Sequence, residues 1–193
     1  MNKKLSQVPL EVSARHVHLS QKDQDALFGA GHVMNIKKEL SQPGQWAAEE
    51  KVTLRGPRGE LSLRVLGPCR RQTQVELSKT DCLKAGIEPA LRLSGTLAGT
   101  PGGTLVGPAG EVRLEEGVVV PKRHIHISDK EAKERDLKDG DIVSVKIGGD
   151  RSLTFHEVHI RVHAMFQLHM HLDTDEGNAA WQEVGGGVGE IIK

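Results

Sequence analysis

A six-residue motif occurs twice in this chain and constrains its fold more than any other feature. Arg15–Ser20 reads Arg-His-Val-His-Leu-Ser, and Arg123–Ser128 reads Arg-His-Ile-His-Ile-Ser. A second pair of segments, Val52–Asp81 and Val143–Asp175, also share a pattern of residues. Repetition over such long segments predicts two copies of one small structural unit.

Short runs of alternating apolar and polar residues dominate the chain, which is typical of β-strands with one buried face. Gly-Pro turns separate these runs, and the expected helices are few and short. Ser20, Ser78 and Ser128 each precede an acidic residue by three positions, which favours a helix N-terminus. The sequence therefore predicts a mainly β fold of two tandem small β-barrels, related by internal duplication, with short capping α-helices. The alternating runs are Leu10–Val12, Val52–Leu54, Leu61–Leu66, Gln74–Leu77, Val112–Leu114, Val143–Ile147 and Leu168–Leu172.

The domain boundary is expected in a region rich in glycine and proline, roughly residues 99–121. We predict a first β-barrel domain over 1–105 and a second over 106–193. The glycine-rich run Gly185–Gly189 predicts a flexible tail at the carboxyl end.

Composition excludes several classes of protein. Twenty-six basic and 26 acidic residues give a formal net charge of +0, which offers no attraction to nucleic acid or an anionic membrane. The aromatic content of 3% leaves few rings for base stacking. Two cysteines cannot form a disulfide framework, and no apolar run approaches the ~20 residues of a membrane span. We therefore expect a cytoplasmic protein without a nucleic-acid or membrane partner.

The 10 histidines are the residues most indicative of function. Residues i and i+2 of a strand point to one face, so the two histidines of each motif can converge on one metal ion. Aligning Gln74–Leu77 with His169–Leu172 places Glu76 opposite His171, and each half then offers three ligands. Three protein ligands leave an open coordination position, as in catalytic zinc sites. The predicted metal ligands are His16, His18 and Glu76 in the first half and His124, His126 and His171 in the second.

Other polar residues leave alternatives open. The duplicated histidine pairs could instead serve packing, and His169 lies in phase with His171 as a potential supporting residue. Arginines near Gly67-Pro68 suit phosphate binding, because the guanidinium fork matches phosphate oxygens. The acidic run Asp173–Glu176 is either a capped helix start or a group that orients histidines.

These motifs together resemble the PduL-type phosphate propanoyltransferase family, the phosphotransacylases first associated with propanediol-degrading bacterial microcompartments. The resemblance runs from about Pro9 to Ala180. Its motifs are Val12–Leu19, Gln42–Gln45, Arg64–Pro68, Gln74–Asp81, Ser94–Gly95, Arg123–His126 and His171–Ala179.

The resemblance implies a pair of β-barrels with an active site between them around two zinc ions, held by the six ligands named above. It implies the reversible conversion of a short-chain acyl-CoA, propionyl-CoA or acetyl-CoA, plus phosphate to acyl phosphate plus coenzyme A. It assigns phosphate binding to Arg70, which with Glu76 forms the catalytic pair, and contacts near coenzyme A to Ser13, Arg64 and Asn178.

Two features qualify this expectation. Ala14 and Gly177 stand where the family often has asparagine and alanine, and only about eight residues precede the first expected strand. Microcompartment members often carry an N-terminal targeting extension, so we expect a free cytoplasmic enzyme; self-association is left open. A zinc-dependent hydrolase of thioesters or acyl phosphates and a non-catalytic metal-binding double-barrel module are the alternative functions.

Overall fold

The computed structural model describes residues 6–182 and 186–192, which form two compact units. The barrel unit comprises residues 6–14, 41–43 and the described residues from 122 onward. The sheet unit comprises residues 15–40 and 44–121. A single cut between residues 99 and 121 would therefore separate the first strand from the unit to which it belongs.

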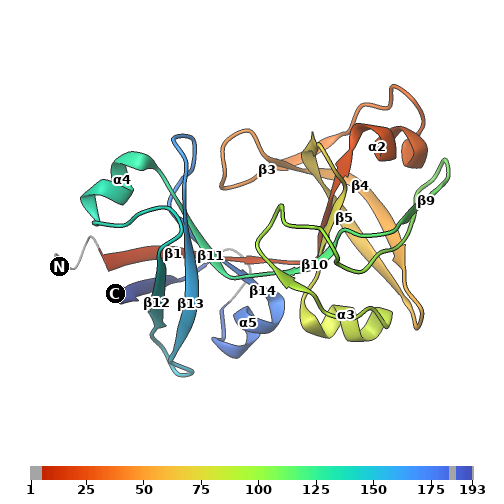
Figure 1. Ribbon diagram of the computed structural model, residues 1–193. Coiled ribbons are helices and arrows are strands. Elements are labelled where there is room, and N and C mark those ends of the chain that lie inside the picture. Colours follow the sequence, from red (N-terminus) through yellow and green to blue (C-terminus); the bar gives the residue numbers. More distant parts are fainter. Residues whose placement is uncertain (1–5, 183–185, 193) are drawn as a thin grey trace. The chain divides into compact units, whose positions relative to one another are not determined.

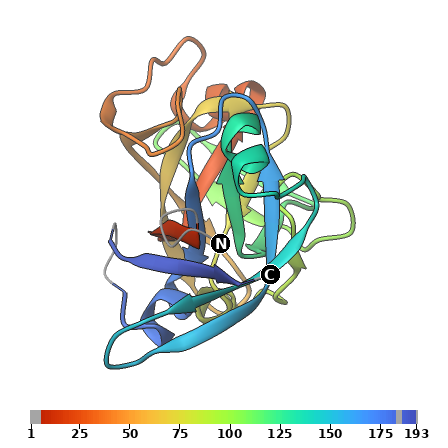
Figure 2. The same cartoon turned by 90° about the vertical axis from the view of Figure 1, so that its left-hand side faces the viewer.

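Six strands close the barrel in the order β1-β14-β11-β13-β12-β15 (Figure 1). The first and last strands, β1 and β15, are antiparallel neighbours in it (Figure 2). The expectation of a flexible tail is wrong for Val188 and Gly189, which lie in β15; residue 185 lies outside the described residues. The elements of this unit are β1 (Gln7–Ser13), β11 (His124–Ile127), α4 (Asp129–Glu134), β12 (Ile142–Ile147), β13 (Leu153–Val162), β14 (His169–Asp173), α5 (Thr174–Ala179) and β15 (Val188–Ile192).

The sheet unit is a curled half-barrel with the strand order β7-β10-β6-β2-β5-β4-β8-β9, and β3 pairs with β4. The predicted mainly β fold with barrel-like sheets and short helices is thus confirmed. The elements are β2 (His16–Ser20), α2 (Gln21–Phe28), β3 (Ile36–Glu39), β4 (Trp46–Arg55), β5 (Glu60–Arg70), β6 (Gln74–Glu76), α3 (Lys79–Ala85), β7 (Leu91–Arg92), β8 (Gly103–Val106), β9 (Glu111–Leu114) and β10 (Val118–Pro121).

The internal duplication is visible in the strand pairing. In the sheet unit, β2 lies between β5, which runs parallel to it, and β6, which runs antiparallel. In the barrel unit, β11 lies between the parallel strand β13 and the antiparallel strand β14. Each His-x-His strand therefore occupies the same position within its own sheet.

Capping side chains fix where the helices begin. The helices α2, α3 and α4 each follow a serine whose hydroxyl accepts the backbone N–H of the third helical residue: Ser20, Ser78 and Ser128. The helix α5 begins at a capping box formed by Asp173 and Glu176. Of the two interpretations of the acidic run, the capped helix start is therefore confirmed.

Each unit has its own apolar core, because the alternating strands turn one face inward. Leu54 and Leu63 are fully buried in the sheet unit, and Ile125 and Met170 are fully buried in the barrel unit. Among the described residues, every helix is too short or too polar to cross a membrane.

Candidate metal centres

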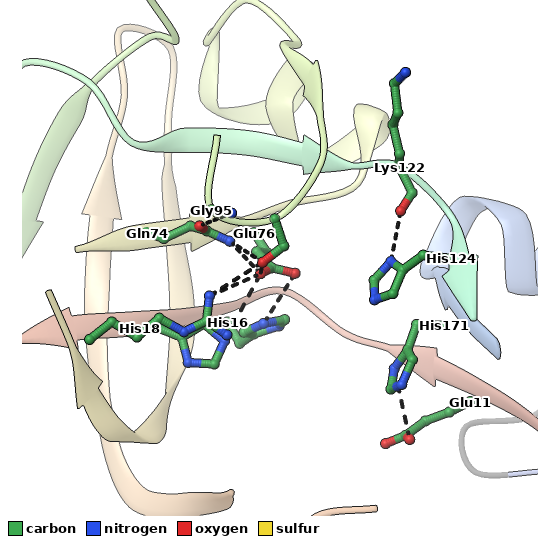
Figure 3. Close-up of polar contacts among 11 residues, drawn as sticks. Glu11, His16, His18, Gln74, Glu76, Gly95, Lys122, His124 and His171 are labelled. Carbon is green, nitrogen blue, oxygen red and sulfur yellow. Dashed lines mark hydrogen bonds and ion pairs between the residues drawn. The ribbon is translucent and has the colours of Figure 1, made fainter. Parts of the chain in front are cut away.

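The first cluster lies on β2 and β6 in the sheet unit. His16 and His18 are two positions apart on β2, and the antiparallel register places His16 directly opposite Glu76. One potential ligand atom from each of the three residues lies within 4.8 Å of the others. All three side chains are buried, so the strand pairing alone brings the predicted first set of ligands together (Figure 3).

Hydrogen-bond donors surround the Glu76 carboxylate. Its Oε1 accepts from Gln74 Nε2 at 2.6 Å and from the Ser94 hydroxyl at 3.1 Å, and it lies 3.9 Å from Arg70 Nη1. The Gln74 amide is itself fixed, because its Oε1 accepts the Gly95 N–H at 2.9 Å (Figure 3). The other oxygen, Oε2, lies 3.4 Å from His16 Nε2. Oε1 also lies 4.0 Å from His18 Nε2, so these donors orient a carboxylate that lies beside both histidines.

The environment of His18 keeps its imidazole neutral. Burial lowers its pKa well below the usual value of 6.5, and the nearby His16 and Arg70 lower it further, while Glu76 acts in the opposite direction. A neutral imidazole retains the lone pair that a metal ligand needs.

The second cluster lies on β11 and β14 in the barrel unit. The antiparallel register places His124 opposite His171, as it places His16 opposite Glu76 in the other unit. His126 Nδ1 lies 3.1 Å from His171 Nε2, and ligand atoms of all three residues lie within 4.8 Å of one another. His124 and His126 are buried, and His171 is largely buried.

One hydrogen bond assigns the tautomer of His124. Its Nδ1 lies 2.8 Å from the backbone carbonyl oxygen of Lys122 (Figure 3). A carbonyl only accepts, so Nδ1 carries the proton and Nε2 retains a lone pair. A metal-ligating histidine commonly donates its other ring nitrogen in this way.

The donor chemistry of both clusters fits a divalent metal ion such as zinc. Two histidines with one glutamate, and three histidines, are both donor sets of catalytic zinc sites. Each cluster supplies three protein ligands and thus leaves a coordination position for substrate or water.

The arginine before each His-x-His has a structural contact that sequence reasoning did not assign. Arg15 Nη1 lies 3.0 Å from the Asp81 carboxylate, and Arg123 Nε lies 2.7 Å from the Glu176 carboxylate. Each arginine also donates to a backbone carbonyl of the neighbouring parallel strand, β5 or β13. Each arginine thus ties its ligand strand to the helix after the third ligand. The sequence does carry a signal for these two ion pairs, because a carboxylate stands five residues after each third ligand: Asp81 after Glu76, and Glu176 after His171.

The remaining predicted site residues lie at different places. Arg70, at the end of β5, is one-third exposed and donates to the Ser94 hydroxyl at 3.3 Å, beside the first cluster. Arg64 pairs in register with the first histidine of β2 and donates to two backbone carbonyls of β4 at 3.0 and 2.7 Å. Ser13 on β1 is half-buried, and Asn178 on α5 is exposed; both belong to the barrel unit.

The fold and its two clusters define a mainly β protein with two potential metal centres, and comparisons with known proteins give its family. The family model described as phosphate propanoyltransferase matches residues 9–183. A phosphate propanoyltransferase of Thermotoga maritima is 51% identical over 176 residues, which cover 90% of this chain and 84% of the relative.

Two further relatives carry the same description. That of Salmonella typhimurium is 53% identical over 175 residues, covering 90% of this chain and 83% of the relative. That of Clostridioides difficile is 46% identical over 192 residues, which cover 99% of this chain and 91% of the relative. The chain therefore belongs to the phosphate propanoyltransferase family. It is a phosphate acyltransferase, which confirms the enzyme class over the non-catalytic module.

Proposed function

We propose that this chain is a two-zinc phosphotransacylase that interconverts a short-chain acyl-CoA plus phosphate with an acyl phosphate plus coenzyme A. The supporting observation is the pair of buried three-ligand clusters at equivalent positions of two repeated sheets. Propionyl-CoA is the first candidate substrate because the family and its relatives are called propanoyltransferases, and acetyl-CoA is the second. A cytoplasmic location stays a prediction from composition.

Six side chains would hold the two zinc ions. A zinc ion with an open coordination position can polarise a carbonyl or phosphoryl oxygen and stabilise a thiolate. The neutral His18, the fixed tautomer of His124 and the oriented Glu76 carboxylate support this assignment. The proposed ligands are His16, His18, Glu76, His124, His126 and His171.

The transfer requires one bond to form and one to break. A phosphate oxygen attacks the thioester carbonyl carbon, the C–O bond forms, and the C–S bond breaks. Coenzyme A leaves as a thiolate and takes up the proton that the hydrogen phosphate ion loses. A covalent acyl-enzyme is not needed for this balance, so direct transfer is the simplest mechanism.

Arg70 is the proposed phosphate-binding residue. Its guanidinium carries a fixed positive charge, is partly accessible, and is oriented by the Ser94 hydroxyl beside Glu76. A guanidinium can hold two phosphate oxygens at once. Holding the nucleophile in line with the carbonyl carbon turns a bimolecular encounter into a near-attack geometry.

Coenzyme A contacts are proposed for Ser13, Arg64 and Asn178. Asn178 is exposed and can offer its amide, and Ser13 offers a hydroxyl from a half-buried position. The Arg64 side chain is anchored on β4 carbonyls, which gives its charge a defined place. Removing these groups is expected to raise the KM for acyl-CoA rather than that for phosphate.

The experiment that tests the proposed function measures thiol release from propionyl-CoA with and without phosphate, before and after chelation. We expect release that requires phosphate, stops when metal is stripped, and returns on addition of zinc. Release without phosphate would indicate a thioester hydrolase on the same metal centres. Phosphate-dependent release that persists in metal-free protein would contradict the role of zinc.

A further inference from the structure

A three-residue segment of the chain leaves the sheet unit and becomes part of the barrel unit. Residues 41–43 lie between β3 and β4 in sequence, yet they belong to the compact unit that contains the second cluster. The segment includes Gln42 of the Gln-Pro-Gly-Gln motif, to which the proposed function assigns no role. Gln42 is only 4% exposed, and a buried amide without hydrogen-bond partners would destabilise the fold.

Both polar atoms of the Gln42 amide are paired with the backbone of one residue. Its Nε2 donates to the carbonyl oxygen of Gln167 at 3.0 Å, and its Oε1 accepts the N–H of Gln167 at 3.1 Å. These two bonds fix the orientation of the amide and imitate the pairing of two strands. The Gln167 side chain is exposed, so the contact depends on the backbone there and not on the side chain.

The backbone that Gln42 holds is the loop 163–167 between β13 and β14. The start of this loop is fixed to the end of β11, because His163 donates its N–H to the carbonyl of Ile127 at 3.2 Å. A tight turn follows, in which the Phe166 N–H donates to the His163 carbonyl at 2.9 Å. The loop is thus fixed at one end by β11 and at the other by Gln42.

Between these two attachments, the Phe166 ring packs on a proposed metal ligand. The centroids of the Phe166 and His126 rings lie 4.2 Å apart, with an angle of 42° between the ring planes. Phe166 is half-buried, and its position follows from the backbone on both sides of it. The Phe166 ring therefore restricts rotation of the His126 imidazole.

The same segment supports a second ligand. The Ser41 hydroxyl donates to the carboxylate of Glu11, and Glu11 Oε2 lies 3.9 Å from His171 Nδ1 (Figure 3). A carboxylate near the outer nitrogen of a ligating histidine is a common supporting group of metal sites.

We infer that Gln42 is a positioning residue of the second metal centre: it fixes the loop 163–167 and, through Phe166, the orientation of His126. This inference rests on the proposed function, because it takes His126 as a metal ligand. Loss of such a supporting residue typically lowers metal affinity by ~10–100-fold. The first centre belongs to the sheet unit, whereas Gln42, Phe166 and His126 belong to the barrel unit, so the zinc affinity of the first centre is expected to stay unchanged.

The test compares Gln42→Leu with Gln167→Ala, which removes a side chain of the same loop and keeps the backbone bonds. Zinc affinity is measured by competition with a chromophoric chelator, and the visible absorption of the cobalt-substituted protein reports ligand geometry. We expect Gln42→Leu to lower the affinity for one of the two zinc ions by ~10–100-fold and to alter the absorption spectrum of the cobalt-substituted protein. Gln167→Ala should match wild type in both. Repeating the comparison in a His16→Ala background assigns the change to the second centre.

Phe166→Ala provides an independent variant, because the effect of Gln42 passes through this ring. Phe166→Ala should reproduce the weaker zinc affinity and the altered cobalt spectrum. If Gln42→Leu fails to fold, Phe166→Ala alone tests whether the loop 163–167 positions His126. Unchanged zinc affinities and cobalt spectra in the folded variants would overturn the inference. A wild-type chain that binds no zinc at the second cluster would overturn the proposed function itself.

Discussion

The two clusters are built on the same strand pairing but differ in chemistry. In the first, an anionic ligand, Glu76, is surrounded by the side-chain donors of Gln74, Ser94 and Arg70. In the second, the equivalent ligand is His171, and all three ligands are imidazoles. Duplication thus preserved the backbone geometry and allowed the third ligand to change. A divalent ion held by three neutral ligands keeps more positive charge than one bound to a carboxylate.

The largest expected effect comes from removing one ligand from either cluster. His124→Ala and His16→Ala should each lose one of two zinc ions and reduce kcat by more than the ~10–100-fold typical of supporting residues. Metal analysis and phosphate-dependent thiol release provide the measurement. Full activity with unchanged zinc content in either variant would contradict the assignment of that cluster.

Exchanging the third ligands sharpens the comparison. Glu76→His removes the carboxylate that accepts from Gln74 and Ser94, so two hydrogen bonds to a charged group, worth about 1.5–3 kcal/mol each, are lost. We expect weaker zinc binding at the first centre and a loss of activity of ~10–100-fold. His171→Glu should also weaken the second centre, because the Glu11 carboxylate lies 3.9 Å from the His171 ring and would repel a second carboxylate at this position. Wild-type kinetics in Glu76→His would show that the difference between the clusters has no function.

Arg70 lies beside the first cluster, and its loss should affect phosphate selectively. Arg70→Ala removes charge-assisted hydrogen bonds worth about 1.5–3 kcal/mol, so the KM for phosphate should rise by about 10-fold or more. Zinc content and the KM for acyl-CoA should stay near wild type. Arg64→Ala is the matched control, and a similar rise in its phosphate KM would contradict the separate roles of the two arginines.

The repeated arginine–carboxylate pairs predict a moderate effect on stability that is similar in both units. Arg15→Ala and Arg123→Ala should each lower the free energy of unfolding by about 1–2 kcal/mol and leave both zinc ions bound. The exposed pair of Arg113 and Glu115 is the control, since surface ion pairs contribute only about 0–1 kcal/mol. Denaturant unfolding measures the stability of Arg15→Ala, Arg123→Ala and the control Arg113→Ala. Equal stability of wild type and Arg15→Ala would contradict the structural role of the Arg15–Asp81 pair.

The smallest effect is a pH dependence of opposite sign in the two units. Burial raises the pKa of Glu176 in the barrel unit above 4.5, although Arg123 opposes this. The folded state then binds more protons than the unfolded state, so this contribution to stability is lost as pH rises from about 4.5 through the raised pKa. Glu176→Gln should reduce this slope in unfolding experiments from pH 4 to 7, to which the raised pKa of the neighbouring Asp173 also contributes. An unchanged slope would contradict the assignment.

Glu50 in the sheet unit is the opposite case. Burial alone would raise the pKa of its carboxyl, but hydrogen bonds from Asn35 and His32 lower it below 4.5. Its contribution is present above 4.5 and is lost as pH falls through the lowered pKa. Glu50→Gln should therefore flatten the loss of stability below pH 4.5, measured by extending the unfolding experiments below pH 4, whereas Glu176→Gln should not.

The sequence predicted what depends on local periodicity. The two-residue spacing of His16 and His18 places them on one face of a strand, and the repeat pointed to Glu76 and His171 as their partners in register. Serine caps and alternating strands are equally local signals. The use of the six clustered side chains as metal ligands stays a prediction, but these side chains lie together in each unit as the spacing predicts.

Long-range contacts could not be predicted in this way. Gln42 and Gln167 are 125 residues apart, and neither lies in a periodic pattern that would pair them. The carboxyl-terminal glycine run predicts a flexible tail, which is wrong for Gly189 because glycine also permits close packing. A Cβ on Gly189 would lie 2.5 Å from a side-chain carbon of Val145, so the absence of a side chain lets β15 close the barrel.

The most direct test of the two-centre account is a zinc titration of the metal-free chain, followed by phosphate-dependent thiol release from propionyl-CoA. The account predicts that activity rises until two equivalents of zinc are bound per chain and then stays constant. Full activity before any zinc is added, or a plateau at one equivalent, would contradict it.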